Sequence, residues 1–138
     1  MTDDFAGSYF TRDELKCPCC SQCVLAPGFL AKLNEIRVQL GNAMIPTSAC
    51  RCSEHNAKVG GRGKSFHLIN SPHITGLQGA CAVDISTIRW PDAKRDKLIR
   101  LARENGWSLG IAHSFIHLDR RIDYPETKWP RRAEWTYS

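Results

Sequence analysis

Two stretches of the chain repeat apolar residues at intervals of three and four, the spacing of a helix with one buried face. The first lies between Pro27 and Gly41, and the second runs from Pro91 to Glu104, before Gly106. Proline in the first turn and glycine after the last turn are common helix boundaries. We therefore predict two amphipathic helices that pack on the core. Their apolar stripes are Leu30, Leu33, Ile36 and Leu40 in the first, and Leu98, Ile99, Leu101 and Ala102 in the second.

Two shorter helices are predicted from their first residues. Thr11 and Glu14 have the spacing of a capping box, in which each side chain bonds the backbone N–H of the other residue. This helix is expected to end before Pro18. Ser53 is expected to cap a second short helix over residues 54–58.

Five apolar or alternating segments are predicted to be strands. They cover residues 44–48, 80–88, 107–111, 114–119 and the aromatic, basic tail 129–137. The third and fourth are close enough in sequence to pair as antiparallel neighbours, and the tail forms a last strand or a clamp against the body. A length of 138 residues with 42% hydrophobic residues suits one domain with a real core. We predict a single α+β domain, residues 1–138, with an antiparallel sheet and helices against one face.

Side chains that bind zinc stand in or beside these strands. Asp84 interrupts the apolar run 80–88, where a carboxylate is costly to bury unless it is paired or coordinated. His117 lies in a segment that alternates polar and apolar residues, so an unbroken strand puts every second residue on its face. That face consists of His113, Phe115, His117 and Asp119. With His67 from the preceding loop, Asp84 and His117 match the three-ligand set of a catalytic zinc site.

The order of short motifs along the chain is more specific than any one of them. The motifs are Arg51-Cys52-Ser53-Glu54-His55-Asn56, Val59-Gly60-Gly61, Ser65-Phe66-His67, Ala82-Val83-Asp84-Ile85 and Phe115-Ile116-His117-Leu118-Asp119. Together they resemble the zinc D-Ala-D-Ala peptidases of the VanX and VanY type, in the hedgehog/DD-peptidase superfamily, and above all its compact phage and prophage members. The resemblance runs from Phe10 to Tyr137. It implies the fold of that superfamily, with an antiparallel sheet that carries the zinc ion.

The resemblance also implies roles for individual residues. His67, Asp84 and His117 would hold one Zn²⁺. Arg51 would hold a substrate carboxylate or stabilise the oxyanion, because its planar fork suits a carboxylate, and Ser65 would bond the substrate or a ligand. The implied substrate is the stem peptide of peptidoglycan, cut at its terminal D-Ala-D-Ala bond or at an internal bond.

One departure leaves the first ligand open between two histidines. Asp84 follows His67 by 17 positions, whereas the family motif SxHxxGxAxD places the two ligands much closer together. The inserted loop contains a second Ser-x-His-x-x-Gly, residues 71–76, with His73 at its centre. We favour His67, because the number of positions between it and the preceding Asn56 matches the spacing in the family. His73 is then expected to lie near the mouth of the site and to contact substrate.

The general base is a second open choice. Better-known relatives often place Glu or Asp three positions before the final ligand, where this chain has Ser114. His113 and Asp119 flank His117 on the predicted strand face. The pKa range of histidine suits proton transfer near neutrality, whereas an acid beside a ligand often orients that ligand. We favour His113, with Asp119 as the rival.

The cysteines suggest a second metal ion without deciding it. Of seven cysteines, Cys17, Cys19, Cys20 and Cys23 fall within seven residues. Cys20-x-x-Cys23 has the spacing of half a structural zinc site, and Cys50-x-Cys52 offers a second half. The alternative is that these are reduced, unligated thiols of a reducing compartment.

Charge and hydropathy narrow the class of partner. The net charge is +5 with a pI of about 8.9, which favours anionic surfaces such as cell wall or nucleic acid. The basic residues are scattered, and no two complete Cys/His pairs stand at finger spacing, so nucleic-acid binding ranks low. No apolar run follows Met1, and no segment is long enough to enter a membrane.

These observations predict a monomer made in the cytoplasm without a signal peptide. It would reach the wall through a holin-type pore, as a phage endolysin does, or in a virion. The rival to a hydrolase is a non-catalytic, zinc-stabilised module that binds cell wall or belongs to a phage tail.

Overall fold

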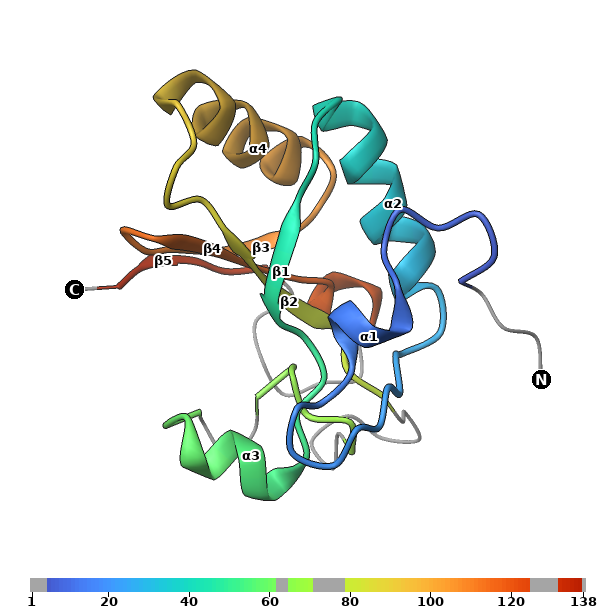
Figure 1. Ribbon diagram of the computed structural model, residues 1–138. Helices are drawn as coiled ribbons and strands as arrows, with labels where there is room; N and C mark the ends of the chain where they lie inside the picture. The colour runs from blue at the N-terminus through green and yellow to red at the C-terminus, as the bar shows by residue number, and fades with distance from the viewer. Residues whose placement is uncertain (1–4, 62–64, 71–78, 125–131, 138) are drawn as a thin grey trace.

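The computed structural model describes residues 5–61, 65–70, 79–124 and 132–137 (Figure 1). Within these ranges the helices are α1 (Arg12–Leu15), α2 (Phe29–Leu40), α3 (Ser53–Lys58) and α4 (Asp92–Glu104), with a 3-10 turn η1 (Arg121–Asp123). The strands are β1 (Ile45–Ser48), β2 (Ala82–Ser86), β3 (Ser108–Ile111), β4 (Phe115–Asp119) and β5 (Glu134–Thr136). The predicted α+β class is confirmed. None of the described helices has the length and apolar character needed to cross a membrane.

The strands form one sheet in the order β1-β2-β4-β3-β5. Neighbours are antiparallel except at one edge, where β5 runs parallel to β3 and sets Trp135 beside Gly110. The prediction of a purely antiparallel sheet is therefore wrong, and the sheet is mixed. The reason lies in the path of the chain, because β5 starts at the end of the sheet where β4 finishes. A strand added beyond β3 from that end must run in the direction of β3.

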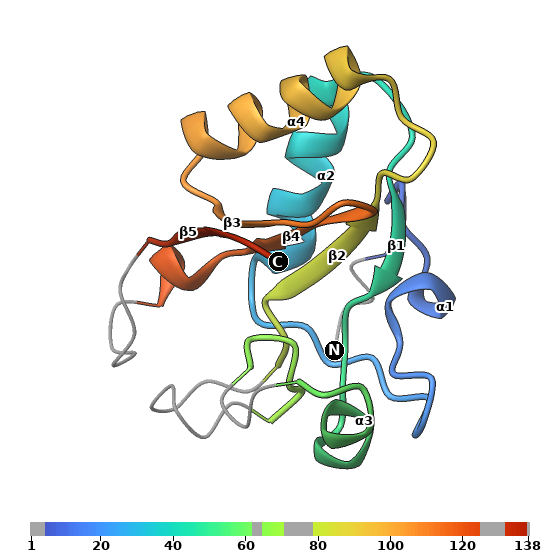
Figure 2. The same ribbon diagram turned by 90° about the vertical axis from the view of Figure 1, so that its left-hand side faces the viewer.

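Alternate residues of the two central strands serve opposite faces of the sheet. α2 and α4 lie together on one side (Figure 2), and the strand residues buried in the same core as these helices include Val83, Ile85, Ile116 and Leu118. Asp84 and His117 alternate with them, so their side chains leave the sheet on the other face. The helices thus cover one face of the sheet and enclose the core, and the polar side chains of Asp84 and His117 project from the opposite face.

Most predicted boundaries agree with the structure. The capping box that opens α1 is present, and α2 ends at Gly41, whose φ of 76° is the left-handed conformation that glycine tolerates best. The cap of α3 differs from the prediction. Cys52 is the N-cap, since its Sγ accepts the backbone N–H of His55 at 3.4 Å, and Ser53 is the first helical residue. β5 confirms a last strand in the tail, while residues 129–131 of the predicted span lie outside the described residues.

Candidate metal centre

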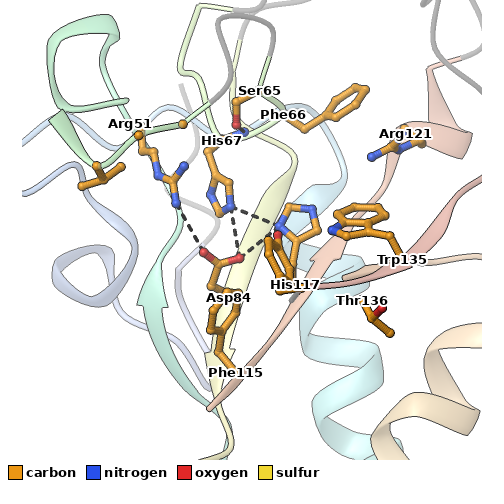
Figure 3. A pocket seen from close by; sticks show the side chains of 14 residues that line it. Arg51, Ser65, Phe66, His67, Asp84, Phe115, His117, Arg121, Trp135 and Thr136 are labelled. Atoms are coloured by element: carbon orange, nitrogen blue, oxygen red, sulfur yellow. Dashed lines mark hydrogen bonds and ion pairs between the residues drawn. The ribbon is translucent and has the colours of Figure 1, made fainter. Parts of the chain in front are cut away.

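Two adjacent strands and one loop bring the three predicted ligands together (Figure 3). Asp84 of β2 is paired with His117 of β4 in the antiparallel register, so the two side chains share a face of the sheet. His67 comes from the loop before β2, and its backbone C=O accepts the N–H of Arg51 at 2.8 Å. The three residues are between 2% and 8% exposed. The site therefore lies in the buried part of the fold, on two paired strands and the loop before them.

The donor atoms form a nearly equilateral triangle. His67 Nε2 lies 3.2 Å from Asp84 Oδ1 and 3.3 Å from His117 Nδ1. His117 Nδ1 lies 3.0 Å from Asp84 Oδ1. Ligands held tetrahedrally at about 2.0–2.1 Å from a zinc ion stand about 3.3 Å from one another. The three atoms therefore fit three corners of a tetrahedral zinc site.

Each histidine has its second ring nitrogen held by an acceptor. His67 Nδ1 lies 2.7 Å from the C=O of Ala49, and His117 Nε2 lies 2.9 Å from Asp119 Oδ2. A carbonyl or an ionised carboxylate only accepts, so these outer nitrogens carry the protons. In the neutral form of each ring the inner nitrogen then presents a lone pair, as a metal ligand must.

Asp119 orients His117 from beneath and is itself held by Arg121. It is fully buried, and the Arg121 guanidinium grips it through Nε to Oδ1 at 2.9 Å and Nη2 to Oδ2 at 2.8 Å. The same guanidinium lies over the rings of Phe66 and Trp135, at 4.6 and 5.4 Å from their centroids. This chain of contacts fixes the His117 imidazole in one orientation.

The electrostatics of the triangle favour positive charge at its centre. Burial lowers the pKa of His67, although Asp84 acts in the opposite direction. Burial also acts against charging His117, but its bonds to Asp119 and Asp84 prevail and raise its pKa to about 9. Despite burial, the two imidazoles hold the pKa of Asp84 well below its usual range. A buried carboxylate that stays ionised between two imidazoles is a donor set suited to a divalent cation, which displaces a proton as it binds.

Arg51 borders the triangle and is held by three acceptors. Its Nη2 lies 3.3 Å from Asp84 Oδ2, Nε donates to Ser48 Oγ at 3.0 Å, and Nη1 donates to Asn56 Oδ1 at 3.3 Å. Asn56 in turn lies against Gly61, where an added Cβ would come within 2.0 Å of the Asn56 side chain. The Asn and Gly of the sequence motif thus act together to position the guanidinium.

Comparison with known families decides what kind of site this is. A sequence profile described as Peptidase M15 matches residues 8–119, which is most of the chain and includes Arg51 and all three candidate ligands. The chain belongs to the peptidase M15 family. No curated protein and no solved structure matches it in the other two comparisons. Membership in this family supports a metallopeptidase.

The M15 site opens into a cavity of about 730 Å³. Besides Arg51 and the candidate ligands, the described residues that line it are Val59, Gly60, Gly61, Ser65, Phe66, Phe115, Arg121, Trp135, Thr136 and Tyr137. Sequence reasoning missed the aromatic wall, made by Phe115 with Trp135 and Tyr137 of the tail. The available signal was the aromatic character of that tail. It predicted that the tail packs against the body of the domain, but not that it lines the cavity.

Gly110 allows the tail to reach the candidate ligands. It is paired with His117 on one side and with Trp135 on the other. A Cβ added to Gly110 would lie 2.6 Å from the Trp135 ring. Because that side chain is missing, the indole settles over the strand, with its ring centroid 5.2 Å from that of His117.

The other predicted site residues of this M15 chain are placed as follows. Ser65 lines the cavity, and its Oγ accepts the backbone N–H of His67 at 3.1 Å, so it shapes the turn that presents this ligand. β4 begins at Phe115, so His113 lies in the exposed turn after β3, and the unbroken strand face is wrong at that residue. Catalytic contacts often tighten only when substrate binds, so its role as base stays a prediction. His73 lies outside the described residues.

Proposed function

We propose that this protein is a zinc-dependent peptidase that hydrolyses amide bonds in the stem peptide of peptidoglycan. The observation that carries the proposal is the triangle of His67, Asp84 and His117 donor atoms beside a large cavity, in a chain of the M15 family. Two imidazoles and one carboxylate with an open fourth position are a ligand set typical of hydrolytic zinc. A zinc ion held there supplies Lewis-acid chemistry, polarising a carbonyl and making a water molecule more acidic.

Arg51 is the residue we assign to substrate binding. It lines the cavity, and its side chain is 12% exposed beside Asp84. Its guanidinium, held beside the candidate ligands by Ser48, Asn56 and Asp84, would offer a positive fork to the carboxylate of a stem peptide. The aromatic wall of Phe115, Trp135 and Tyr137 offers apolar contact to the alanine methyl groups of such a peptide. Ser65 and His73 remain proposed substrate contacts.

Proton transfer falls to His113 in this proposal, and Asp119 acts only through His117. Asp119 is fully buried and is not among the described residues that line the cavity. It therefore holds the ligand and does not meet the substrate. His113 lies in the exposed turn between β3 and β4 and, like Asp119, is not among the described residues that line the cavity, so its ring would have to move towards the bound peptide.

A non-catalytic wall-binding or phage-tail module is the alternative. One observation favours it: among the described residues that line the cavity, Asp84 is the single carboxylate, and it belongs to the ligand set. Such a module would hold zinc and bind stem peptides without cutting them. As an enzyme, the protein would act as a phage endolysin or as a virion-borne monomer.

The decisive experiment incubates the zinc-loaded protein with purified muropeptides of known structure and weighs the products by mass spectrometry. Release of terminal D-alanine from pentapeptide stems indicates a carboxypeptidase, whereas cleavage of cross-linked dimers or of internal bonds indicates an endopeptidase. Asp84→Asn, which keeps the shape of the side chain, is the matched control and should release nothing. Intact muropeptides that co-sediment with fully zinc-loaded protein would overturn the peptidase and favour the binding module.

A further inference from the structure

Four thiols from two separate segments gather away from the peptidase site. The Sγ atoms of Cys17, Cys20 and Cys52 all lie within 4.8 Å of one another, and the Cys19 side chain bonds that of Cys52. All four are free thiols. We propose that they bind a second, structural zinc ion, with Cys19 as the fourth ligand. Thiolates bound tetrahedrally at about 2.3 Å from zinc stand about 3.8 Å apart, so a small contraction of the cluster completes the site.

The turn that carries three of these thiols has the shape of a metal-binding knuckle. Backbone N–H groups of Cys19 and Cys20 both point at Cys17 Sγ. The turn is closed by bonds of 2.8 Å from Ser21 N–H to the Cys17 C=O and from Cys17 N–H to the Gln22 C=O. Ser21 has a φ of 63°, and no other described non-glycine residue has a positive φ. Such a conformation is costly for serine, and it turns the chain so that the thiols converge.

Backbone N–H groups point at two of the four sulfurs, those of Cys17 and Cys52. Cys52 N–H donates to Cys17 Sγ at 3.4 Å, and His55 N–H donates to Cys52 Sγ at the same distance. Thiolates are the form that binds zinc, so each thiol that enters the site gives up its proton to solvent as the ion binds.

The ligand set differs from the one that spacing suggested. Cys20-x-x-Cys23 and Cys17-x-x-Cys20 have the same spacing, and the structure uses the second. Cys23 Sγ instead lies 4.0 Å from Cys50 Sγ. Neither Cys23 nor Cys50 belongs to the group of thiols that gathers around Cys17, which makes Cys23 a matched control.

The second ion would link the cysteine turn to the peptidase site. Cys52 directly follows Arg51, whose guanidinium contacts Asp84, and the neighbouring Cys50 N–H donates to the C=O of Leu15 at the end of α1. An ion held by both segments fixes the backbone on which Arg51 stands. This consequence rests on the proposed function, whereas the metal site itself does not.

Zinc content and cobalt spectra test the metal site directly. Full-length protein purified under reducing conditions should hold two zinc ions per chain, one for each donor group. Replacement by Co²⁺ should produce an intense sulfur-to-cobalt charge-transfer band, which an imidazole and carboxylate site does not give. His117→Ala should keep that band with one ion per chain, whereas Cys52→Ser and Cys20→Ser should lose it. Cys23→Ser should match the parent protein.

Each contrary outcome is also distinct. One zinc per chain in the parent protein with no sulfur-to-cobalt band would overturn the site, and so would disulfides among the four thiols in protein purified anaerobically with zinc. Because the parent spectrum is read without any substitution, poor folding of a variant cannot hide the answer. Cys19→Ser should weaken zinc binding, and an unchanged affinity would overturn Cys19 as fourth ligand. For the link to Arg51, Cys52→Ser should raise KM several-fold while kcat changes little, and an unchanged KM would remove the link.

Discussion

The two donor clusters of this protein are built on opposite principles. The His67, Asp84 and His117 cluster stands on two paired strands and the loop before β2, is almost fully buried and has three donors beside a cavity. The thiol cluster stands on a turn and a loop, brings together Cys17, Cys20 and Cys52, and has the exposed Cys19 as its proposed fourth donor. Catalytic zinc sites keep a position open and structural sites close it. The difference teaches that rigidity comes from the sheet in the first cluster and must come from the metal in the second.

Removal of one of the three candidate ligands beside the cavity should have the largest effect. We expect His67→Ala to lose one zinc ion and all hydrolysis, because two remaining donors do not hold the ion in place. His73→Ala should keep both and alter only KM. Zinc analysis and muropeptide kinetics on the two variants check this, and the reverse result would move the first ligand to His73.

Replacement of His113 should have the next largest effect. His113→Ala is expected to lower kcat by about 10²-fold with zinc content and KM near those of the parent, since a general base typically contributes that much. Ser114→Ala, one residue away in the same turn, serves as the control and should be neutral. A His113→Ala enzyme with the parent kcat would exclude this residue as base.

Replacement of Asp119, the residue that orients the candidate ligand His117, should have a smaller effect. Asp119→Asn can present its amide N–H to His117 Nε2 and so disturb the tautomer, which we expect to weaken zinc binding by about 10–100-fold. Asp123→Asn, which also removes a carboxylate from an arginine pair, should leave zinc affinity unchanged. Equal affinities for parent and Asp119→Asn, measured by competition with a chelator, would contradict the orienting role.

Chelation should separate the two clusters with the smallest change in the molecule. A mild chelator should remove the ion beside the cavity first, abolishing activity while the melting temperature falls only slightly, because the sheet holds the ligands without it. The thiol-bound ion should be released only by a thiol reagent. Its loss should lower the melting temperature more than loss of the ion beside the cavity does. Simultaneous loss of both ions and of the fold would mean that the clusters do not differ in this way.

Parts of this picture follow from local pattern and parts do not. Asp84 and His117 could be predicted because period-two strands reveal which residues share a face. The hydrogen bond between His67 and the Ala49 C=O could not be predicted, because it uses a backbone carbonyl that any residue would offer. Spacing alone does not choose among the thiols, because Cys17, Cys20 and Cys23 repeat one spacing, and only the approach of Cys52 in space singles out Cys17 and Cys20. The parallel edge of β5 likewise depends on the path of the chain between distant strands.

The absent side chain at Gly110 has an optical consequence. It lets the Trp135 indole rest 5.2 Å from the His117 ring, centroid to centroid. Indole emission is quenched by paramagnetic ions at such range. The fluorescence of Trp135 should therefore report whether a paramagnetic metal ion is bound at His117. A Trp135→Phe variant would remove that signal and leave the contribution of the remaining tryptophans as background. Titration of Cu²⁺ or Co²⁺ into the protein could thus be followed from within, without a label.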